Sequence, residues 1–160
     1  MENYCFFETP VGMITIAADE SGITRISFGQ TDIPGKKEAS PLTDLAYRQL
    51  CEYFEGRRKE FDLPLSPAGT PFQQAVWREL MKIPYGETRS YSDIAAGAGN
   101  PKACRAVGMA NNKNPIAIVI PCHRVVGKSG SLTGYAGGLE VKQLLLDLER
   151  QNKKNVLIIQ

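Results

Sequence analysis

The hydrophobic pattern predicts a small β-sheet and a covering helix in the first third of the chain. Two short β-favouring runs, 13–18 and 23–29, are separated by the turn-rich residues 19–22, as in a β-hairpin. Ser40 can cap a helix with Pro41 at its first position, and apolar residues then recur at helical spacing until Gly56. We expect this helix to cover one face of the sheet.

A segment rich in proline and glycine, 61–70, interrupts this pattern. Such segments commonly connect independently folded parts of a chain. We therefore predict two domains, an α/β domain over residues 1–67 with a supporting role and a mostly helical domain over 68–160. A length of 160 residues is enough for one ordinary domain or two small ones.

The second part of the chain begins with a clear helix signal. Thr70 and Gln73 form a capping box around Pro71, and the helix that follows has a buried stripe of Phe72, Val76, Trp77 and Leu80. Residues 90–112 then predict two short helices around a tight turn, the first capped by Ser90 or Ser92 and the second starting at Asn100 and Pro101. This arrangement is typical of a helix-turn-helix unit.

The second of these short helices is rich in small residues: Ala103, Ala106, Gly108 and Ala110. Small side chains let the helix backbone approach a partner closely, which is compatible with tight packing inside an all-helical subdomain or with DNA binding. The basic residues Lys102, Arg105 and Lys113 favour DNA.

The charge distribution is uneven, although the net charge is only +2. Residues 1–65 contain 7 Lys and Arg against 11 Asp and Glu, whereas residues 66–160 contain 12 against 6. From Thr88 to Lys128 there are six basic residues and a single acid, Asp93. This excess indicates a surface that faces a polyanion, or a solvated basic face without a partner.

The sequence also indicates where the protein resides. The longest aliphatic run, in 114–121, is far shorter than the ~20 residues that span a bilayer, and the acidic N-terminus does not resemble a signal peptide. We expect an intracellular protein whose four cysteines are free thiols. One histidine and scattered cysteines do not make a familiar zinc site.

A candidate nucleophile follows the apolar run 116–120, which has the pattern of a buried strand. The run stops at Pro121, and Cys122, His123 and Arg124 come next. An imidazole near a thiol can remove its proton, so Cys122 is either a nucleophile or an inert buried cysteine. Because neighbouring side chains on a strand point to opposite faces, the pair can cooperate only where Pro121 turns the chain.

A third chemical group lies in the C-terminal helix. Val141, Leu144, Leu145 and Leu148 have the spacing of an inward-facing stripe, and Glu149 follows at its edge. A half-buried carboxylate there needs a partner such as an imidazole N–H. The sequence leaves open whether Glu149 completes a Cys–His–Glu chain or is a solvated surface acid.

The segments GETRSYSDIAAGAGNPKACRAVGMANNKNP and IPCHRVVGKSGSLTGYAGGLEVKQLLL together resemble the O6-alkylguanine-DNA alkyltransferases, also called methylated-DNA–protein-cysteine S-methyltransferases. The hallmark Pro-Cys-His-Arg-Val is Pro121–Val125 here, and the resemblance covers about residues 70–150. The first 65 residues resemble the RNase H-like α/β domain of the family less specifically. The resemblance implies an α/β domain followed by a helical domain with a helix-turn-helix.

The resemblance also implies a role for each matching residue. Cys122 accepts the alkyl group, His123 draws off its proton through a water molecule, and Glu149 orients His123. Asn114 holds the active-site turn, and Tyr91 donates to a ring nitrogen of the flipped guanine. Arg105 fills the space that the base leaves, and the residues expected beside it on DNA are Ala103, Ala106, Gly108, Lys102, Lys113 and Ser90. The residues expected to line the pocket are Val125, Tyr135, Ala136 and Gly137.

Two departures from the family pattern are visible. Many relatives have serine where this chain has Ala136, so only a backbone N–H is available there to assist the leaving oxygen. Some relatives hold zinc through N-terminal cysteines and histidines, but this chain has Cys5 and no histidine besides His123. We therefore expect no metal and no cofactor.

The predicted function is irreversible, single-turnover transfer of an alkyl group from O6-alkylguanine in duplex DNA to Cys122, with O4-methylthymine as a second candidate substrate. We expect a monomer in the cytoplasm, or in the nucleus of a eukaryote. The alternative from another class is a non-catalytic helix-turn-helix or lesion-sensing module, although sensing relatives lack the acceptor cysteine that this chain retains. A cysteine hydrolase is disfavoured because no acyl-transfer motif accompanies the thiol.

Overall fold

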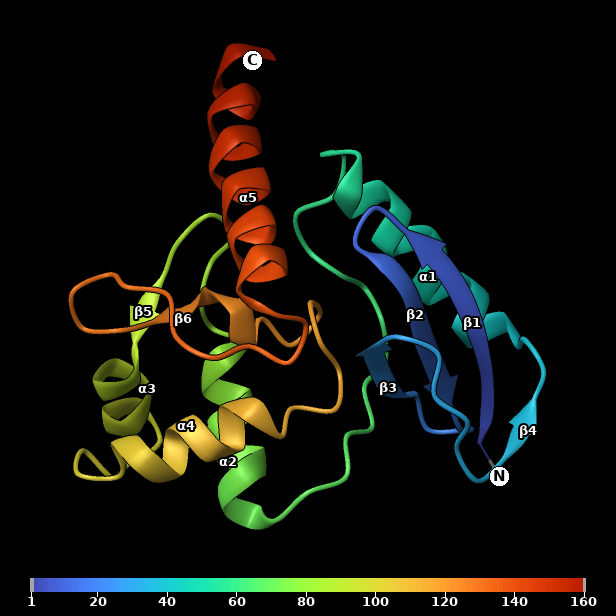
Figure 1. Cartoon of the computed structure of the whole chain (residues 1–160), viewed down its shortest axis with the longest axis horizontal. Helices are drawn as coiled ribbons and strands as arrows, with labels where there is room; N and C mark the ends of the chain where they lie inside the picture. The colour runs from blue at the N-terminus through green and yellow to red at the C-terminus, as the bar shows by residue number, and fades with distance from the viewer. Residues whose placement is uncertain (1, 160) are drawn as a thin grey trace. The chain divides into compact units, whose positions relative to one another are not determined.

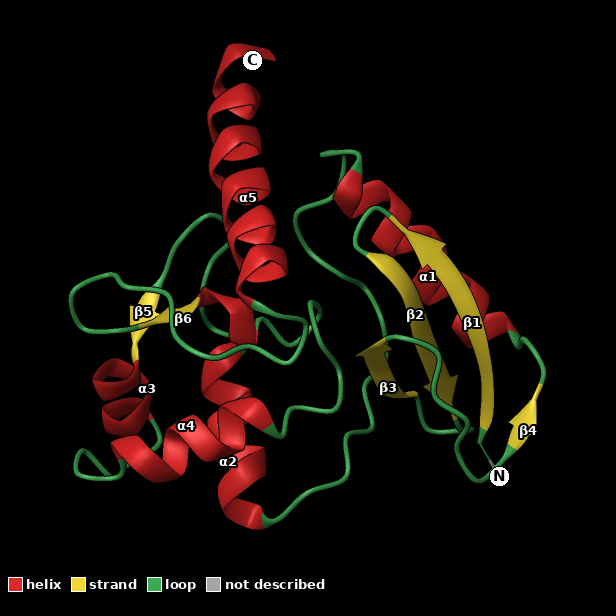
Figure 2. Ribbon diagram, viewed as in Figure 1, coloured by secondary structure: helices red, strands yellow, loops and turns green. Residues whose placement is uncertain are grey.

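The computed structural model describes residues 2–159, with side chains described as far as Lys153. The chain forms two compact units. The first comprises residues up to Ala68 together with Pro115–Val119, and the second comprises Gly69–Asn114 and the chain from Ile120 onward. Figure 1 shows the sheet with its helix in one unit and the remaining helices in the other, and Figure 2 shows the same elements by type. The predicted mixed α/β fold is confirmed.

The first unit is a four-stranded sheet with one helix packed on it. Its strands are β1 (Asn3–Thr9), β2 (Gly12–Ala18), β3 (Ile23–Phe28) and the short β4 (Lys36–Lys37), in the order β3-β2-β1-β4. The predicted hairpin is β2–β3, and β1 pairs antiparallel with β2 along its whole length. Helix α1 (Pro41–Phe54) packs on β1 and β2, and Ser40 caps it as expected.

The apolar run 116–120 is buried, as its composition indicates, but it is not a strand. Only Ile116 pairs, in an isolated bridge with Ile26, and the next residues turn. Ile118 has a φ of 71°, a left-handed conformation that is costly for a β-branched residue. The expectation of a strand is therefore wrong. Residues 117–119 turn the chain directly after the bridge of Ile116, so the pairing with β3 does not continue as a ladder.

The second unit contains three short helices that pack on one another, α2 (Pro71–Leu80), α3 (Tyr91–Gly97) and α4 (Cys104–Asn112). The capping box of Thr70 and Gln73 is present, and Ser90 rather than Ser92 caps α3. Helix α4 does not begin at Asn100 and Pro101, which form a turn. It starts at Cys104 after Ala103, whose side chain makes no cap hydrogen bond.

The long helix α5 (Leu139–Ile159) follows a two-stranded pairing of β5 (Arg89–Ser90) with β6 (Val125–Val126). Its predicted buried stripe is wrong by one position. Leu144 is 40% exposed, whereas the fully or almost fully buried positions in the part of α5 whose side chains are described, up to Lys153, are Lys142, Leu145, Leu146 and Glu149. These have the i, i+3, i+4, i+7 spacing of an inward face, so two ionisable side chains occupy core positions. No helix among the described residues is long and apolar enough to cross a membrane.

Candidate active site

The candidate nucleophile, Cys122, lies on a turn that a side-chain hydrogen bond stabilises. Cys122 begins the single-turn 3-10 helix η1 (Cys122–Arg124), directly after Pro121. The Asn114 side-chain amide donates to the Ile120 carbonyl at 2.9 Å and bridges the base of this turn. The 3-10 turn replaces the alternating geometry of a strand, so Cys122 and His123 are not forced to opposite faces.

The Cys122 thiol is in a dry environment, with only 6% of the residue exposed. Burial raises the pKa of this thiol, while a hydrogen bond with Asn114 and the positive charge of Lys142 act to lower it. The resting form is thus the neutral thiol. A nucleophilic role requires a nearby base to take its proton.

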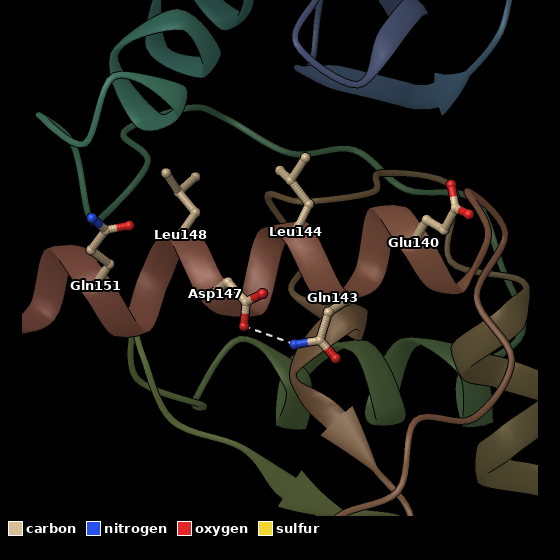
Figure 3. Close-up of a pocket in the computed structure, with 6 residues that line it drawn as sticks. All are labelled: Glu140, Gln143, Leu144, Asp147, Leu148 and Gln151. Atoms are coloured by element: carbon tan, nitrogen blue, oxygen red, sulfur yellow. Dashed lines mark hydrogen bonds between the residues drawn. The ribbon is translucent and has the colours of Figure 1, made fainter.

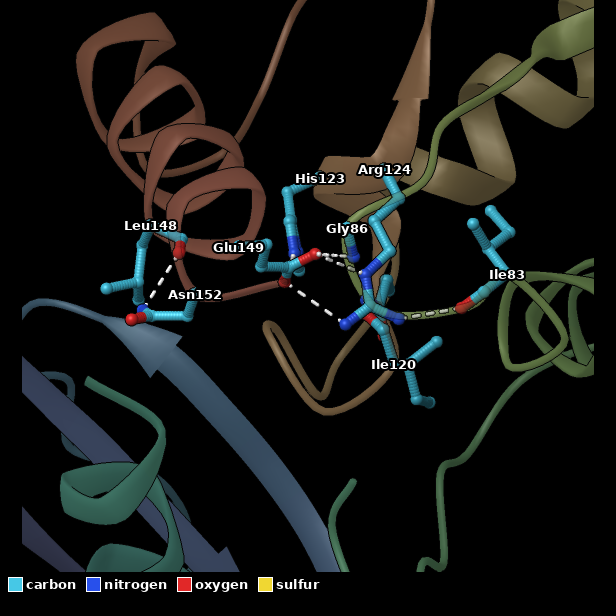
Figure 4. Close-up of polar contacts among 9 residues, drawn as sticks. Ile83, Gly86, Ile120, His123, Arg124, Leu148, Glu149 and Asn152 are labelled. Atoms are coloured by element: carbon cyan, nitrogen blue, oxygen red, sulfur yellow. Dashed lines mark hydrogen bonds and ion pairs between the residues drawn. The ribbon is translucent and has the colours of Figure 1, made fainter. Parts of the chain in front are cut away.

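The residue after Cys122, His123, is held by a buried cluster of charges (Figure 4). Nε2 of His123 lies 2.6 Å from Oε2 of Glu149, and both side chains are fully buried. Arg124 donates to both oxygens of the same carboxylate, from Nε at 2.8 Å and from Nη2 at 3.1 Å, and its Nη1 donates to the Ile83 carbonyl. The alternative in which Glu149 is a solvated surface acid is therefore excluded.

The Gly86 backbone supplies one more donor to this carboxylate. Its N–H lies 3.1 Å from Oε1 of Glu149, and its φ of 79° is in the region that favours glycine. A Cβ at this position would come within 2.7 Å of the Lys153 side chain. The loop before β5 thus approaches α5 closely enough to satisfy the carboxylate because residue 86 has no side chain.

The electrostatics of the cluster define the protonation of His123. Burial by itself raises the pKa of Glu149, but hydrogen bonds from His123 and Arg124 and the positive charge of Arg124 outweigh it and lower that pKa to about 2. Arg124 is permanently charged, so Glu149 remains a carboxylate whichever form His123 takes. Burial lowers the pKa of His123, and the neutral imidazole must donate from Nε2 to Glu149. Its Nδ1, which is buried and has no hydrogen-bond partner among the described residues, is then a free base.

Acid is expected to destabilise the protein through this cluster. Glu149 has a folded-state pKa of about 2 against an ordinary value of 4.5, so its contribution is present above pH 4.5 and is lost as the pH falls toward 2. The shift corresponds to about 3 kcal/mol. The lowered pKa of His123 acts in the same direction, because the unfolded chain takes up a proton near pH 6.5 that the folded protein resists.

Urea unfolding between pH 7 and pH 4 measures this effect, since the fall in unfolding free energy should begin near pH 6.5 and steepen below pH 5. A protein of constant stability over that range would contradict the protonation states assigned to Glu149 and His123.

Sequence reasoning missed Lys142 and the chain of contacts that it makes. Lys142 is fully buried on α5, and its Nζ donates to the Thr133 carbonyl at 3.1 Å. The Thr133 hydroxyl lies 2.5 Å from the hydroxyl of Tyr91 on α3. Burial lowers the pKa of Lys142, and the Cys122 thiolate would raise it. The signal in the sequence was weak, because a lysine between Val141 and Leu144 is normally a surface residue.

The residues expected to bind DNA are separate from this buried cluster. Arg105, Ala106 and Lys113 are exposed on or just after α4, Lys102 is exposed in the turn before it, and Ala103 and Gly108 are half-buried. Ser90 differs from the others because its hydroxyl already accepts the Asp93 N–H as the cap of α3.

The residues expected to line the pocket follow Cys122 in the chain. Val125 is fully buried and pairs with Arg89 across β5 and β6. Tyr135 and Gly137 are half-buried in the loop before α5, and Ala136 between them is exposed. Burial raises the pKa of the Tyr135 phenol well above its usual value, and the nearby Cys122 acts in the same direction. Tyr135 therefore lies within electrostatic reach of the Cys122 thiol.

A separate hollow runs along α5 and contains none of the predicted site residues (Figure 3). Its lining is Glu140, Gln143, Leu144, Asp147, Leu148 and Gln151. By helical spacing these residues lie on the side of α5 opposite Glu149. No group of three or more His, Cys, Asp or Glu in the part of the chain that the structure describes is arranged to hold a metal ion.

Two family models match the chain and together cover most of it. One describes the ribonuclease-like domain of 6-O-methylguanine DNA methyltransferase and matches residues 3–67. The other describes the DNA binding domain of 6-O-methylguanine DNA methyltransferase and matches residues 71–151. The chain belongs to the 6-O-methylguanine DNA methyltransferase family. The resemblance inferred from Pro121–Val125 is thereby confirmed.

Curated relatives match the chain over nearly its whole length. A methylated-DNA–protein-cysteine methyltransferase of Methanosarcina acetivorans is 52% identical in an alignment of 155 residues that covers 91% of this chain and 97% of the relative. The constitutive methylated-DNA–protein-cysteine methyltransferase of Bacillus subtilis is 52% identical and covers 96% and 99% of the two chains.

Solved structures give the same result. The Mycobacterium tuberculosis O6-methylguanine methyltransferase superposes with a TM-score of 0.87 at 47% identity, covering 95% of this chain and 94% of that one. A structure of the M. tuberculosis protein in complex with DNA gives a TM-score of 0.88 at 47% identity, with 94% of each chain covered.

Proposed function

We propose that this chain removes alkyl groups from O6-alkylguanine in duplex DNA by transferring them irreversibly to Cys122. Alkyl transfer in DNA repair is the activity of its family and of this chain. Beyond this activity, we propose which residue accepts the alkyl group, what the other site residues do and which alkylated base is the substrate. The observation that carries it is the neutral His123, locked through Nε2 to an ionised Glu149 and left with a free Nδ1 one residue from a buried thiol.

The reaction uses one proton and forms one bond. Nδ1 of His123, acting through a water molecule, takes the proton of Cys122, and the thiolate attacks the alkyl carbon in line with the C–O bond. The S–C bond forms as the C–O bond breaks, and its electron pair remains on the guanine. A proton then reaches the guanine, so unmodified guanine is restored and Cys122 becomes a neutral thioether. Water does not readily cleave an S-alkyl bond, so the protein acts once.

Other residues of the site assist this transfer. Lys142 supplies a buried positive charge near Cys122, which favours the thiolate over the thiol. Tyr91 donates from its hydroxyl to a ring nitrogen of the departing guanine, and Thr133 lies within hydrogen-bond distance of that hydroxyl. Backbone and side-chain groups of Val125, Tyr135, Ala136 and Gly137 line the pocket, and Asn114 maintains the turn that presents the thiol.

The guanine must leave the helix because its alkyl carbon is inaccessible inside a base pair. Extrusion costs a few kcal/mol, less for a poorly paired lesion. We propose that DNA contacts made by the second domain, residues 68–160, offset this free-energy cost. The helix-turn-helix of α3 and α4 makes these contacts. Arg105 occupies the vacated space, and Lys102 and Lys113 contact phosphates. The domain formed by residues 1–67 supports this unit.

Replacing Arg105 with alanine should slow transfer at saturating DNA by about tenfold or more, because the extruded base then returns to an unfilled space. Lys102→Ala removes the same charge in the turn before α4 and serves as the control. It should weaken binding without changing the rate at saturation. Single-turnover kinetics on a duplex with one O6-methylguanine separates the two effects, and equal behaviour of both variants would contradict the assignment of Arg105.

The direct test is incubation of the protein with a duplex that carries O6-methylguanine, followed by peptide mass analysis. We expect one added methyl group per protein, on the Cys122 peptide, and a methylthioether that persists on dialysis. Repeated turnover, or intact DNA binding without modification, would contradict the proposal. The same experiment with a duplex that carries O4-methylthymine tests the second substrate, and sedimentation tests the expected monomer.

Because the proposed substrate is chromosomal DNA, we propose that the protein acts in the cytoplasm or, in a eukaryote, in the nucleus.

A further inference from the structure

One large apolar side chain stands on the exposed face of α4. At 100° per residue, the exposed positions of this helix and its C-terminal cap cover an arc of about 120°. These positions are Arg105, Ala106, Met109, Asn112 and Lys113. Met109 falls near the centre of the arc and is 67% exposed, more than Met81, Leu139 or Leu144. A partner that approaches this face therefore meets Met109.

A single exposed apolar residue is ordinary on a protein surface, but the surroundings of Met109 are not. The segment 104–113 contains no acidic residue, and Arg105 and Lys113 lie on either side of Met109 along the exposed face. The exposed neighbour Ala106 is small, so Met109 projects beyond it. An apolar side chain between cations fits the charge and the narrow shape of a DNA minor groove, where proteins insert residues such as Met, Leu or Phe.

We propose that Met109 is an apolar DNA contact of α4, packing against the sugars and base edges of the minor groove beside the step that Arg105 enters. The inference rests on the proposed function, because it takes double-stranded DNA as the occupant of this face. Arg105 and Met109 are four residues apart and therefore neighbours on the helix surface. The unbranched thioether adapts to the groove without a fixed shape, and its binding energy comes from burial rather than charge.

The test compares Met109→Ala with Met109→Leu and Met109→Gln, because all four residues favour helix and none should unfold α4. Met109→Ala and Met109→Gln should weaken binding to duplex DNA by about tenfold, and Met109→Leu should bind almost like the parent. Met81→Ala is the matched control, since Met81 is 48% exposed at the C-terminal cap of α2. It should bind like the parent.

Salt titration gives a readout that a general disturbance of α4 would not produce. For Met109→Ala, the plot of log Kd against log salt should be displaced parallel to that of the parent. Lys113→Ala should reduce the slope by about one instead.

Each outcome is decisive for the inference. Parent-like binding by Met109→Ala, or a changed salt slope, would overturn it, as would equal loss in Met81→Ala. Sedimentation identifies the rival occupant, because a second copy of the chain on this face would make the parent self-associate and Met109→Ala monomeric. Failure of the proposed function is a separate result, since it would appear as absent methyl transfer in the parent protein itself.

Discussion

Cys122→Ser is expected to abolish methyl transfer while leaving DNA binding intact. Serine differs from cysteine by one atom, so the turn closed by Asn114 should persist. A hydroxyl is far harder to deprotonate than a thiol, and the neutral His123 does not generate an alkoxide at neutral pH. We expect the rate of transfer to fall by at least about 10³-fold.

The measurement is mass analysis after exposure to excess methylated duplex, with DNA affinity determined in parallel. Cys51→Ser, on α1 in the first unit, makes the same chemical change at a half-buried thiol and should transfer normally. A methyl group found on the Cys122→Ser protein, or loss of transfer in Cys51→Ser, would contradict the assignment of Cys122 as the acceptor of the methyl group.

Glu149→Gln should both slow transfer and destabilise the fold. The amide keeps the shape of the side chain but removes the charge that Arg124 and the Nε2–H of His123 face. A buried arginine without its counter-ion costs about 3–5 kcal/mol, which corresponds to a fall in Tm of about 10 °C or more. A glutamine NH₂ group can also turn toward Nε2, and the imidazole then carries its proton on Nδ1, where the base is needed.

We expect the transfer rate of Glu149→Gln to fall on the order of 10²-fold below the temperature at which the variant unfolds. Glu140→Gln is the matched control, since it lies on the exposed side of the same helix. Calorimetry and single-turnover kinetics at 20 °C measure the two effects separately. If Glu149→Gln is as stable as the control, the cluster has no structural role, and if it is unstable but fully active, Glu149 does not orient His123.

The elements with local signals were predictable from the sequence. The capping box of Thr70 and Gln73 uses side chains three residues apart, so the start of α2 could be read directly, whereas the cap of α3 was narrowed only to Ser90 or Ser92. The grouping of Pro121, Cys122 and His123 was equally local. Pairing of His123 with Glu149 was one of two open alternatives, because their separation of 26 positions in the sequence gave no means of deciding.

The wrong predictions of local structure have a common physical cause. The spacing of apolar residues predicts neither which charged side chains are buried nor where the chain turns. In α5 the leucines 144 and 148 suggested one face, whereas Lys142 and Glu149 are buried because each has a specific partner. The run 116–120 is as apolar as a strand, yet it folds as a succession of turns with Ile118 in a left-handed conformation. The start of α4 was misplaced because Asn100 and Pro101 resemble a cap, although the turn continues to Ala103.

The return of residues 115–119 to the first unit has a consequence for the independence of the two domains. The Ile26 N–H donates to the Pro115 carbonyl and the Ala117 N–H donates to the Ile26 carbonyl, so this segment completes the sheet-bearing unit just before the chain reaches Cys122. A fragment that began at residue 69 would carry these residues without their hydrogen-bond partners. We therefore expect that removing the N-terminal domain would disturb the chain immediately upstream of Cys122, so this domain should not be a detachable module.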